Sequence, residues 1–201
     1  SVTWEKSTMR SWRNGYDASE NTGGDSGVDY TSDNFISAAF SEKEQAAIAE
    51  TTVVNDDNGS IEDGNDTTDK IFLLSIAEAN NSSYFADNDS RISTNTAYVV
   101  DGGKIGGDMY SAGKGDWWWL RSPGSGAYYA AGLAGNGDVD SAGVLGDNED
   151  RAVRPAFHLD LNSVLFTSAA AGGKAGDGLN AVADYDGNEW KLTLLDNSRN
   201  F

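Results

Sequence analysis

The sequence predicts an α+β fold, in which a few short helices come first and short strands with long loops follow. Two segments near the start of the chain carry helix-start signals, Ser7–Tyr16 and Ser41–Glu50. Several later segments are short apolar or aromatic runs of the kind that form strands. The chain also holds 24 glycines and only two prolines, which indicates many turns and little linker.

The first helix is defined at both ends by its sequence. Ser7 can accept a hydrogen bond from a backbone amide of the first turn, as a helix cap does. Met9 and Trp12 lie three residues apart and so share one face of the helix. Gly15 follows Asn14 and ends the helix, because glycine adopts the left-handed backbone that a helix end requires.

A second helix is expected at Ser41–Glu50. Ser41 and Glu44 have the spacing of a capping box, in which each side chain satisfies an amide at the helix start. Phe40 precedes the cap, where a hydrophobic staple begins. A shorter helical piece is expected at Ile76–Ala79.

Strands are expected where short apolar runs are bounded by turn residues. These runs are Lys70–Ser75, Tyr98–Val100, Asp116–Pro123, Val153–Leu161 and Trp190–Leu195. Gly102–Gly115 is a glycine-rich connection, and residues 17–34 and 55–69 read as surface loops. With 201 residues, of which 38% are hydrophobic, the chain suits one domain with a substantial core.

The charge of the chain restricts its partners. Fourteen basic residues against 32 acidic ones give a net charge of −18, which repels nucleic acid and anionic membranes. An acidic surface that only keeps the protein in solution is the equally good alternative explanation. The sequence has no cysteine and no apolar run long enough for a membrane span, so disulfides, thiol catalysis and membrane insertion are not expected.

Patterns that could indicate catalysis are weak. His158 is the only histidine, and beside Phe157 and Leu159 we interpret it as structural rather than as part of a Ser-His-Asp triad. Asp138 and Asp140 could be imagined as a glycosidase pair, but neither has surroundings that would raise one pKa and leave the other low. We therefore expect no catalytic residue.

Metal and nucleotide patterns are equally weak. Oxygen ligands between Asp56 and Asp66 could accept a structural calcium ion, although the spacing is not that of an EF-hand. Asp184–Asn188 is a fainter version of the same signal. Gly102–Gly107 lacks the phosphate-loop pattern. We expect no cofactor and no dedicated metal site, with structural calcium as the open alternative.

The most informative segment is Trp117–Phe157. It begins with WWWLRSPG and ends with AVRPAF, and each end carries one of the two prolines. The part between them is rich in small and polar residues, with no Lys, Trp or Phe. Within it, a sparse frame has the residues that a hairpin needs for packing and turning, with Leu133 and Val139 facing inward and two glycines free to take positive φ. That frame consists of Ala130, Ala131, Leu133, Gly137, Val139 and Gly143.

These motifs resemble a bacterial, phage and archaeal group of C-type-lectin-like domains. The resemblance rests on WWLRSPG at Trp118–Gly124, an Ala-Ala followed by spaced glycines, and VRPAF at Val153–Phe157. Similar features occur at Trp4, Ser7–Asn14, Ala39–Ser41, Thr51–Asn55 and Asp69–Ser75, so the likeness covers most of residues 1–166. Some members of this group are the variable proteins of diversity-generating retroelements.

The resemblance implies a C-type-lectin-like fold with two short helices, a small antiparallel sheet and long loops. Variable members of the family display ligand-contacting side chains whose codons are altered at adenines, and the residue types of this middle segment are reachable from asparagine codons in that way. The sequence departs from the pattern at Trp117, a third tryptophan, and at Ala152, where glycine is usual. Residues 17–34 look like an insertion. Residues 167–201 lie outside the clear match and could add a hairpin or pack the Trp190 strand onto the sheet.

The resemblance assigns the display residues by position within residues 117–157. They are Ser125, Gly126, Tyr128, Tyr129, Gly132, Ala134, Asp140, Ser141, Val144, Leu145, Asp147 and Asn148. Tyr128 and Tyr129 are the expected anchors, because tyrosine offers rigid contact area at low entropic cost. Trp118, Trp119, Arg121 and Arg154 belong to the frame, and the two arginines are expected to bond carbonyls or carboxylates at the loop ends.

Together these features predict a single ligand-binding domain over residues 1–201 that is not an enzyme. The expected ligand is a protein or surface molecule of another cell or host, and the expected setting is extracellular, on a cell surface or on a virion, as a monomeric domain. A static adhesion or tail-fibre domain is the alternative function. An enzyme is the weaker alternative: a glycan-active enzyme would need two buried carboxylates near Tyr128, and a formylglycine-generating enzyme would need cysteines that the chain lacks.

Overall fold

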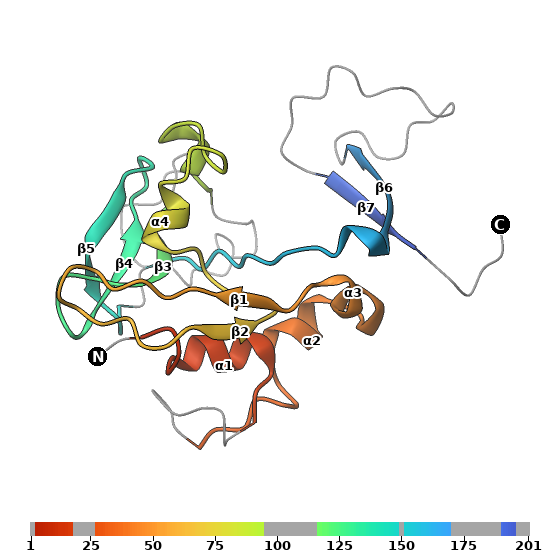
Figure 1. Cartoon of the computed structure of the whole chain (residues 1–201), viewed down its shortest axis with the longest axis horizontal. Helices are drawn as coiled ribbons and strands as arrows, with labels where there is room; N and C mark the ends of the chain where they lie inside the picture. The colour runs from red at the N-terminus through yellow and green to blue at the C-terminus, as the bar shows by residue number, and fades with distance from the viewer. Residues whose placement is uncertain (1–2, 18–26, 95–115, 149–150, 170–189, 196–201) are drawn as a thin grey trace.

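The structure is a computed structural model that describes residues 3–17, 27–94, 116–148, 151–169 and 190–195. It is an α+β fold with short helices and small antiparallel sheets, as the sequence predicts (Figure 1). The helices are α1 (Thr8–Asn14), α2 (Phe35–Ala39), α3 (Glu42–Ala47) and α4 (Ile76–Ala79), with 3₁₀ turns η1 (Asp89–Arg91) and η2 (Leu161–Ser163). The strands are β1 (Thr51–Val53), β2 (Thr67–Asp69), β3 (Trp118–Pro123), β4 (Tyr129–Leu133), β5 (Val139–Leu145), β6 (Val164–Ala169) and β7 (Trp190–Leu194).

The helix α1 has the ends that its sequence predicts. Ser7 accepts a hydrogen bond from the Arg10 amide, and Gly15 ends the helix with a φ of 71°. Asn14, its last residue, accepts from the backbone amides of Lys70 and Ile71 and donates to the Ile71 carbonyl at 2.9 Å. This one side chain therefore ties α1 to the chain that follows β2.

The capping box of α3 is also confirmed, since Ser41 and Glu44 satisfy each other's backbone amides. The helix is shorter than predicted and ends at Ala47, because Ile48 leaves it to form a β-bridge with Leu159. The short helix α4 forms as expected, whereas α2, which Asn34 caps, is a helix that is not predicted from the sequence.

The predicted strand Lys70–Ser75 is wrong. The strand here is β2, which pairs with β1. In the apolar run after it, Ile71, Phe72 and Leu73 are buried, but the run forms only a single bridge, between Phe72 and Ala156. Backbone groups of the run find other hydrogen-bond partners. The Arg121 amide donates to the Leu74 carbonyl, and the amides of Lys70 and Ile71 donate to the Asn14 side chain. A neighbouring strand is therefore not needed.

The predicted strand Val153–Leu161 is also wrong as a continuous strand. Within it, the structure has two isolated bridges, from Ala156 to Phe72 and from Leu159 to Ile48, and Ala152 just before it bridges to Trp118. Pro155 has no amide to donate, and the two bridges of the segment go to different parts of the chain, so no single ladder forms. The segment links parts of the core that are distant in sequence.

The C-terminal part adds a hairpin, in which β6 and β7 pair antiparallel. This confirms the strand expected at Trp190–Leu195, and Figure 1 places the hairpin on the opposite side of the molecule from β5. The expected strand Tyr98–Val100, the connection Gly102–Gly115 and the turn Asp184–Asn188 lie outside the described residues.

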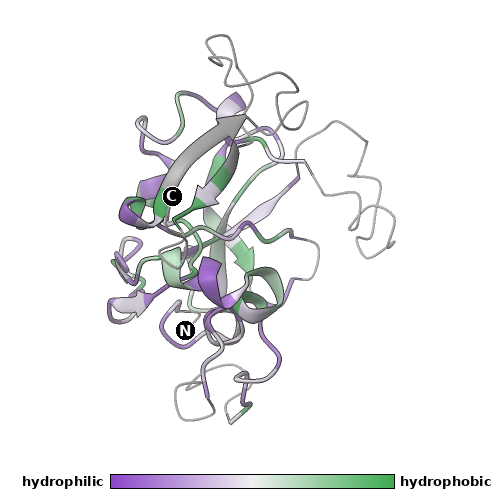
Figure 2. Ribbon diagram, turned by 90° about the vertical axis from the view of Figure 1, so that its right-hand side faces the viewer, coloured by the Kyte–Doolittle hydropathy of each residue, from purple (hydrophilic) through white to green (hydrophobic). Residues whose placement is uncertain are grey.

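The central sheet has the order β3–β4–β5 and is packed on both faces. Trp118 lies in one core cluster with Leu120, Ala131 and Leu133, and Trp119 lies in another with Trp4, Phe72 and Ala130. Adjacent residues of a strand point to opposite faces, so the tryptophan pair anchors both sides of the sheet. The strands carry much of the hydrophobic character, whereas the surrounding loops are largely hydrophilic (Figure 2).

A third cluster joins the helical part to the rest. Ile36, Ile48 and Ile71 form its centre, and Phe40 packs edge-on against Phe157 with ring centroids 5.4 Å apart. Within the described residues, no helix is long and apolar enough to cross a membrane.

Candidate functional site

The frame expected within Trp117–Phe157 has the predicted positions. Ala130, Ala131 and Leu133 are buried in β4. Gly137 and Gly143 take φ values of 83° and 69°, a backbone region that glycine adopts without a steric penalty. The β4–β5 hairpin is therefore built by the residues that the sequence assigns to packing and turning.

The display residues fall into three groups by their exposure. The exposed group is Ser125, Tyr128, Tyr129, Ser141, Leu145, Asp147 and Asn148. The half-buried group is Gly126, Ala134, Asp140 and Val144, and Gly132 is buried. The exposed group comes from the turn between β3 and β4, from the first residue of β4, from β5, and from the residues directly after β5.

Three large side chains dominate the exposed group. Tyr128, Tyr129 and Leu145 are 71%, 39% and 49% exposed. Tyr129 and Leu145 are paired across β4 and β5, so their side chains lie on the same side of the hairpin. The Tyr129 ring covers Gly126 so closely that a Cβ there would lie 2.8 Å from the ring. Gly126 therefore allows this ring to lie flat against the turn.

Gly132 is covered by a side chain that sequence reasoning missed. The Arg151 guanidinium lies 4.3 Å from the centre of the Trp117 ring and 5.3 Å from that of Trp119, and it fills the space where a Cβ of residue 132 would be. Arg151 also forms an ion pair with Asp140 at 3.6 Å. A larger residue in place of Gly132 would have to displace this stacked arginine.

Val144 faces inward, unlike its neighbour Leu145. It packs against the cluster that contains Trp119 and Ala130, and it is paired with Ala130 across the hairpin. Substitution of Val144 would therefore change core packing as well as the surface.

Backbone hydrogen bonds hold the exposed residues in place. The Ser125 amide donates to the Ala142 carbonyl at 2.8 Å, and the Gly146 amide donates to the Tyr128 carbonyl at 2.9 Å. Asn58 was not expected to contribute, yet its side chain donates to the carbonyls of Pro123 and Ser141 at 3.0 and 2.8 Å. No local sequence signal could identify Asn58, because its partners are 65 and 83 residues away.

The two frame arginines bond as predicted. Arg121 donates to the Leu73 and Val54 carbonyls at 2.7 and 2.8 Å and forms an ion pair with Glu78. Arg154 donates to the Arg91 carbonyl at 3.3 Å, and its guanidinium lies 5.2 Å from the centre of the Trp118 ring. Both arginines therefore fix the ends of the segment to the core.

The residues considered for catalysis, His158, Asp138 and Asp140, make contacts within the fold. The Nδ1 atom of His158 lies 3.0 Å from the Thr51 hydroxyl, and its ring packs near Phe72. Asp138 accepts hydrogen bonds from Asn88 and Asn136, and Asp140 accepts one from the Gly143 amide.

The loop considered for calcium uses its carboxylates for backbone contacts. Asp57 accepts from the Asp63 amide and Asp66 from the Asn55 amide, at 3.0 and 2.9 Å. In the part of the chain that the structure describes, no three acidic or histidine side chains are grouped so as to hold a metal ion.

Gly143→Ala is expected to destabilise the hairpin by about 2 kcal/mol or more. The left-handed backbone alone costs an alanine roughly 1 kcal/mol, and its Cβ would lie 2.2 Å from the Ala130 carbonyl oxygen. Gly59→Ala is the matched control, because Gly59 has a φ of 66° but open space at its Cβ position. Urea denaturation of both variants checks this, and equal losses of stability would contradict the steric explanation.

Comparison with known proteins places the chain in a family. No curated protein and no solved structure matches it. A family described as a domain of unknown function, DUF6273, matches residues 1–161, which include α1 and the whole β3–β4–β5 sheet. Because that match covers most of the chain, the protein belongs to the DUF6273 family.

Proposed function

We propose that this protein is a C-type-lectin-like binding domain whose ligand-contacting residues are diversified by a retroelement. The observation that carries the proposal is the contrast within the β4–β5 hairpin. Tyr128, Tyr129 and Leu145 project to solvent, whereas Ala130, Ala131 and Leu133 are buried. Such a division allows surface side chains to change while the frame keeps its packing.

The binding face comprises the seven exposed display residues. Their backbone is held by several hydrogen bonds, so little conformational entropy is lost when a ligand binds. Two exposed tyrosines supply the aromatic area that central contacts of protein interfaces use. A protein or cell-surface ligand with a neutral or basic patch suits this face, because the chain carries a net charge of −18.

The double variant Tyr128→Ala, Tyr129→Ala is expected to lose ligand binding and to keep its melting temperature within about 2 °C, since exposed changes have small effects on stability. A ligand is first identified by testing the wild-type domain against a panel of purified surface proteins by biolayer interferometry. Binding of that ligand is then compared between the wild type and the variants. Tyr84→Ala is the control, because Tyr84 is 56% exposed and lies away from the hairpin in sequence. A large fall in the melting temperature of the double variant would place the tyrosines in the core and contradict the proposal.

Diversification has its own test in the surrounding DNA. A near-copy of the segment that encodes Trp117–Phe157, differing only at adenines and lying beside a reverse transcriptase gene, would support it. Absence of such a copy would leave a static lectin-like adhesion domain as the better proposal.

A further inference from the structure

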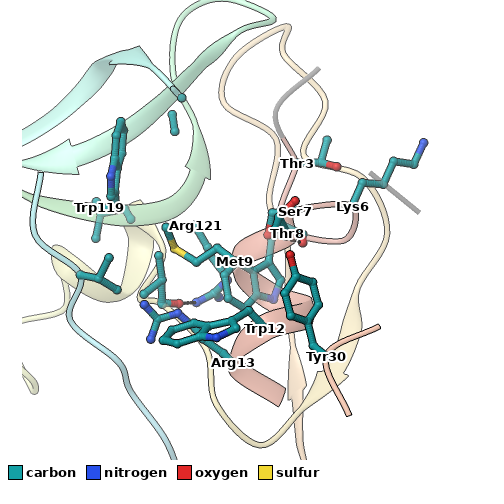
Figure 3. Close-up of a pocket in the computed structure, with 16 residues that line it drawn as sticks. Thr3, Lys6, Ser7, Thr8, Met9, Trp12, Arg13, Tyr30, Trp119 and Arg121 are labelled. Atoms are coloured by element: carbon teal, nitrogen blue, oxygen red, sulfur yellow. Dashed lines mark hydrogen bonds between the residues drawn. The ribbon is translucent and has the colours of Figure 1, made fainter. Parts of the chain in front are cut away.

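A pocket with a volume of about 670 Å³ lies between α1 and the sheet. Met9 and Trp12 of α1 line one side, and Trp119 and Ala130 of the sheet line another. Figure 3 shows Met9, Trp12, Arg13 and Arg121 together, between Trp119 on one side and Tyr30 and Lys6 on the other. Pockets of this size commonly hold small organic ligands.

The charge of this pocket is opposite to that of the protein. Lys6, Arg13 and Arg121 line it, and none of the described lining residues is acidic. This contrasts with a chain that has 32 acidic and only 14 basic residues. The pocket therefore offers an electropositive, largely apolar environment in an otherwise acidic molecule.

Arg13 is the unusual residue of the lining. Its side chain is only 2% exposed, and its Nε and Nη1 atoms have no hydrogen-bond partner among the described residues. Its guanidinium carbon lies 5.5 Å from the centre of the Phe35 ring, a cation–π contact. Burial lowers the pKa of Arg13 to about 10. A buried charge without a partner is costly, and charges in this situation are usually paired.

Arg121 repeats the pattern in part. Its Nη1 and Nη2 atoms are hydrogen-bonded to carbonyls and to Glu78, but its Nε atom is buried with no partner in the residues that the structure describes. Both guanidinium groups of the pocket therefore have unpaired N–H donors in the described residues. Arg13 has two such nitrogen atoms and Arg121 has one, so Arg13 is the better candidate to pair with an acceptor.

We propose that this pocket binds a small organic monocarboxylate, with Arg13 pairing to the carboxylate and the apolar wall holding an aromatic or aliphatic body. A planar guanidinium matches the two oxygens of a carboxylate. The aromatic rings of Trp12 and Trp119 supply contact area for the body of the ligand. A ligand with several negative charges is disfavoured, because the chain as a whole carries −18.

This site is separate from the display face in composition, because none of the twelve display residues lines the pocket. The two surfaces meet at Gly146, which lines the pocket and directly follows Leu145. The pocket would therefore bind its ligand whether or not the display residues vary.

The test uses 2-naphthoate and its neutral analogue 2-naphthalenemethanol with the whole chain, measured by isothermal titration calorimetry. Wild-type protein is expected to bind 2-naphthoate at least tenfold more tightly than the alcohol, because only the carboxylate pairs with Arg13. Arg13→Gln is expected to remove this preference. Lys43→Gln is the control, since it removes the same charge from an exposed position of α3.

Three results would overturn the proposal. They are no binding of 2-naphthoate at millimolar concentration, equal binding of acid and alcohol by the wild type, and unchanged 2-naphthoate binding by Arg13→Gln. Tighter binding of 2-naphthyl phosphate than of 2-naphthoate would overturn the assignment to a carboxylate. The comparison of acid and alcohol needs only the wild-type chain, so the test holds even if Arg13→Gln does not fold.

Discussion

Trp118→Ala is expected to lower the free energy of unfolding by about 3–5 kcal/mol, as large-to-small changes in a core do. Trp118 is 1% exposed and packs with Ala79, Leu120, Ala131 and Leu133. Its removal would leave a cavity between the sheet and α4. A domain of this size has a total stability of only about 5–15 kcal/mol, so the variant is expected to be partly or wholly unfolded at 37 °C.

The same substitution would also disturb the end of the display segment. The Arg154 guanidinium lies over the Trp118 ring, and Trp118 forms the bridge to Ala152. Circular dichroism during urea denaturation measures the loss of stability. Trp12→Ala is the comparison, because Trp12 is 37% exposed and should cost much less. A Trp118→Ala protein with an unchanged melting temperature would place Trp118 outside the core.

Local signals in the sequence predicted local structure well. The cap at Ser7, the capping box of Ser41 with Glu44, and the positive φ of Gly137 and Gly143 are all confirmed. The helix signals involve groups within three or four residues of each other, and positive φ is a property of a single residue. Neighbouring residues in the chain are therefore enough to determine them.

Errors arose where long-range partners decide the structure. The run Lys70–Ser75 has the composition of a strand, but Asn14, more than fifty residues away, takes two of its amides. Val153–Leu161 also reads as a strand, yet its two isolated bridges go to Phe72 and Ile48, which lie in separate segments. Neither arrangement leaves a pattern in the local sequence.

The orientation of the display residues was only partly predictable for a similar reason. Pairing of β4 with β5 is irregular between Ala130 and Gly132, which breaks the simple alternation of inward and outward residues. Val144 consequently faces the core, and Gly132 lies beneath Arg151. Tyr128 and Tyr129 are exposed as expected, because they lie at the end of the turn before β4 and at the first position of β4, before this irregularity.

Asp63 is expected to give the chain an unusual dependence of stability on pH. Its side chain is fully buried, and neither carboxylate oxygen has a hydrogen-bond partner in the described part of the chain. Burial raises the pKa of Asp63 from 3.8 to about 7. The positive charge of Arg121 lowers this pKa in part, and the Trp4 amide, which lies outside hydrogen-bonding geometry, lowers it less. Asp57 and Asp56 add further repulsion that raises the pKa.

The sign of the effect follows from proton binding. Between pH 4 and pH 7 the folded protein keeps a proton on Asp63 that the unfolded chain has already released. Stability is therefore expected to fall as pH rises through this window, by up to about 1.4 kcal/mol per pH unit, and to stay low above pH 7. This is the reverse of an ordinary salt-bridged aspartate, which stabilises a protein as pH rises.

Asp63→Asn is expected to remove this dependence, because asparagine is neutral at every pH. The free energy of unfolding of the variant minus that of the wild type is expected to be about 2–3 kcal/mol larger at pH 8 than at pH 5. The reason is that pH 5 lies two units below the raised pKa of Asp63, whereas pH 8 lies above it. Comparing the two pH values cancels the cost of the buried amide, which is the same at both. Guanidinium chloride denaturation at each pH gives the four free energies of unfolding.

Asp33→Asn separates this effect from the reduced charge of an acidic protein. Asp33 is exposed, so its replacement removes one negative charge without relieving burial. If both variants change stability equally at pH 5 and pH 8, then general repulsion explains the result, and Asp63 is ionised without penalty in the folded protein. A pH-dependent gain only in Asp63→Asn would mean that the fold retains a buried acid at the expense of its own stability near neutral pH.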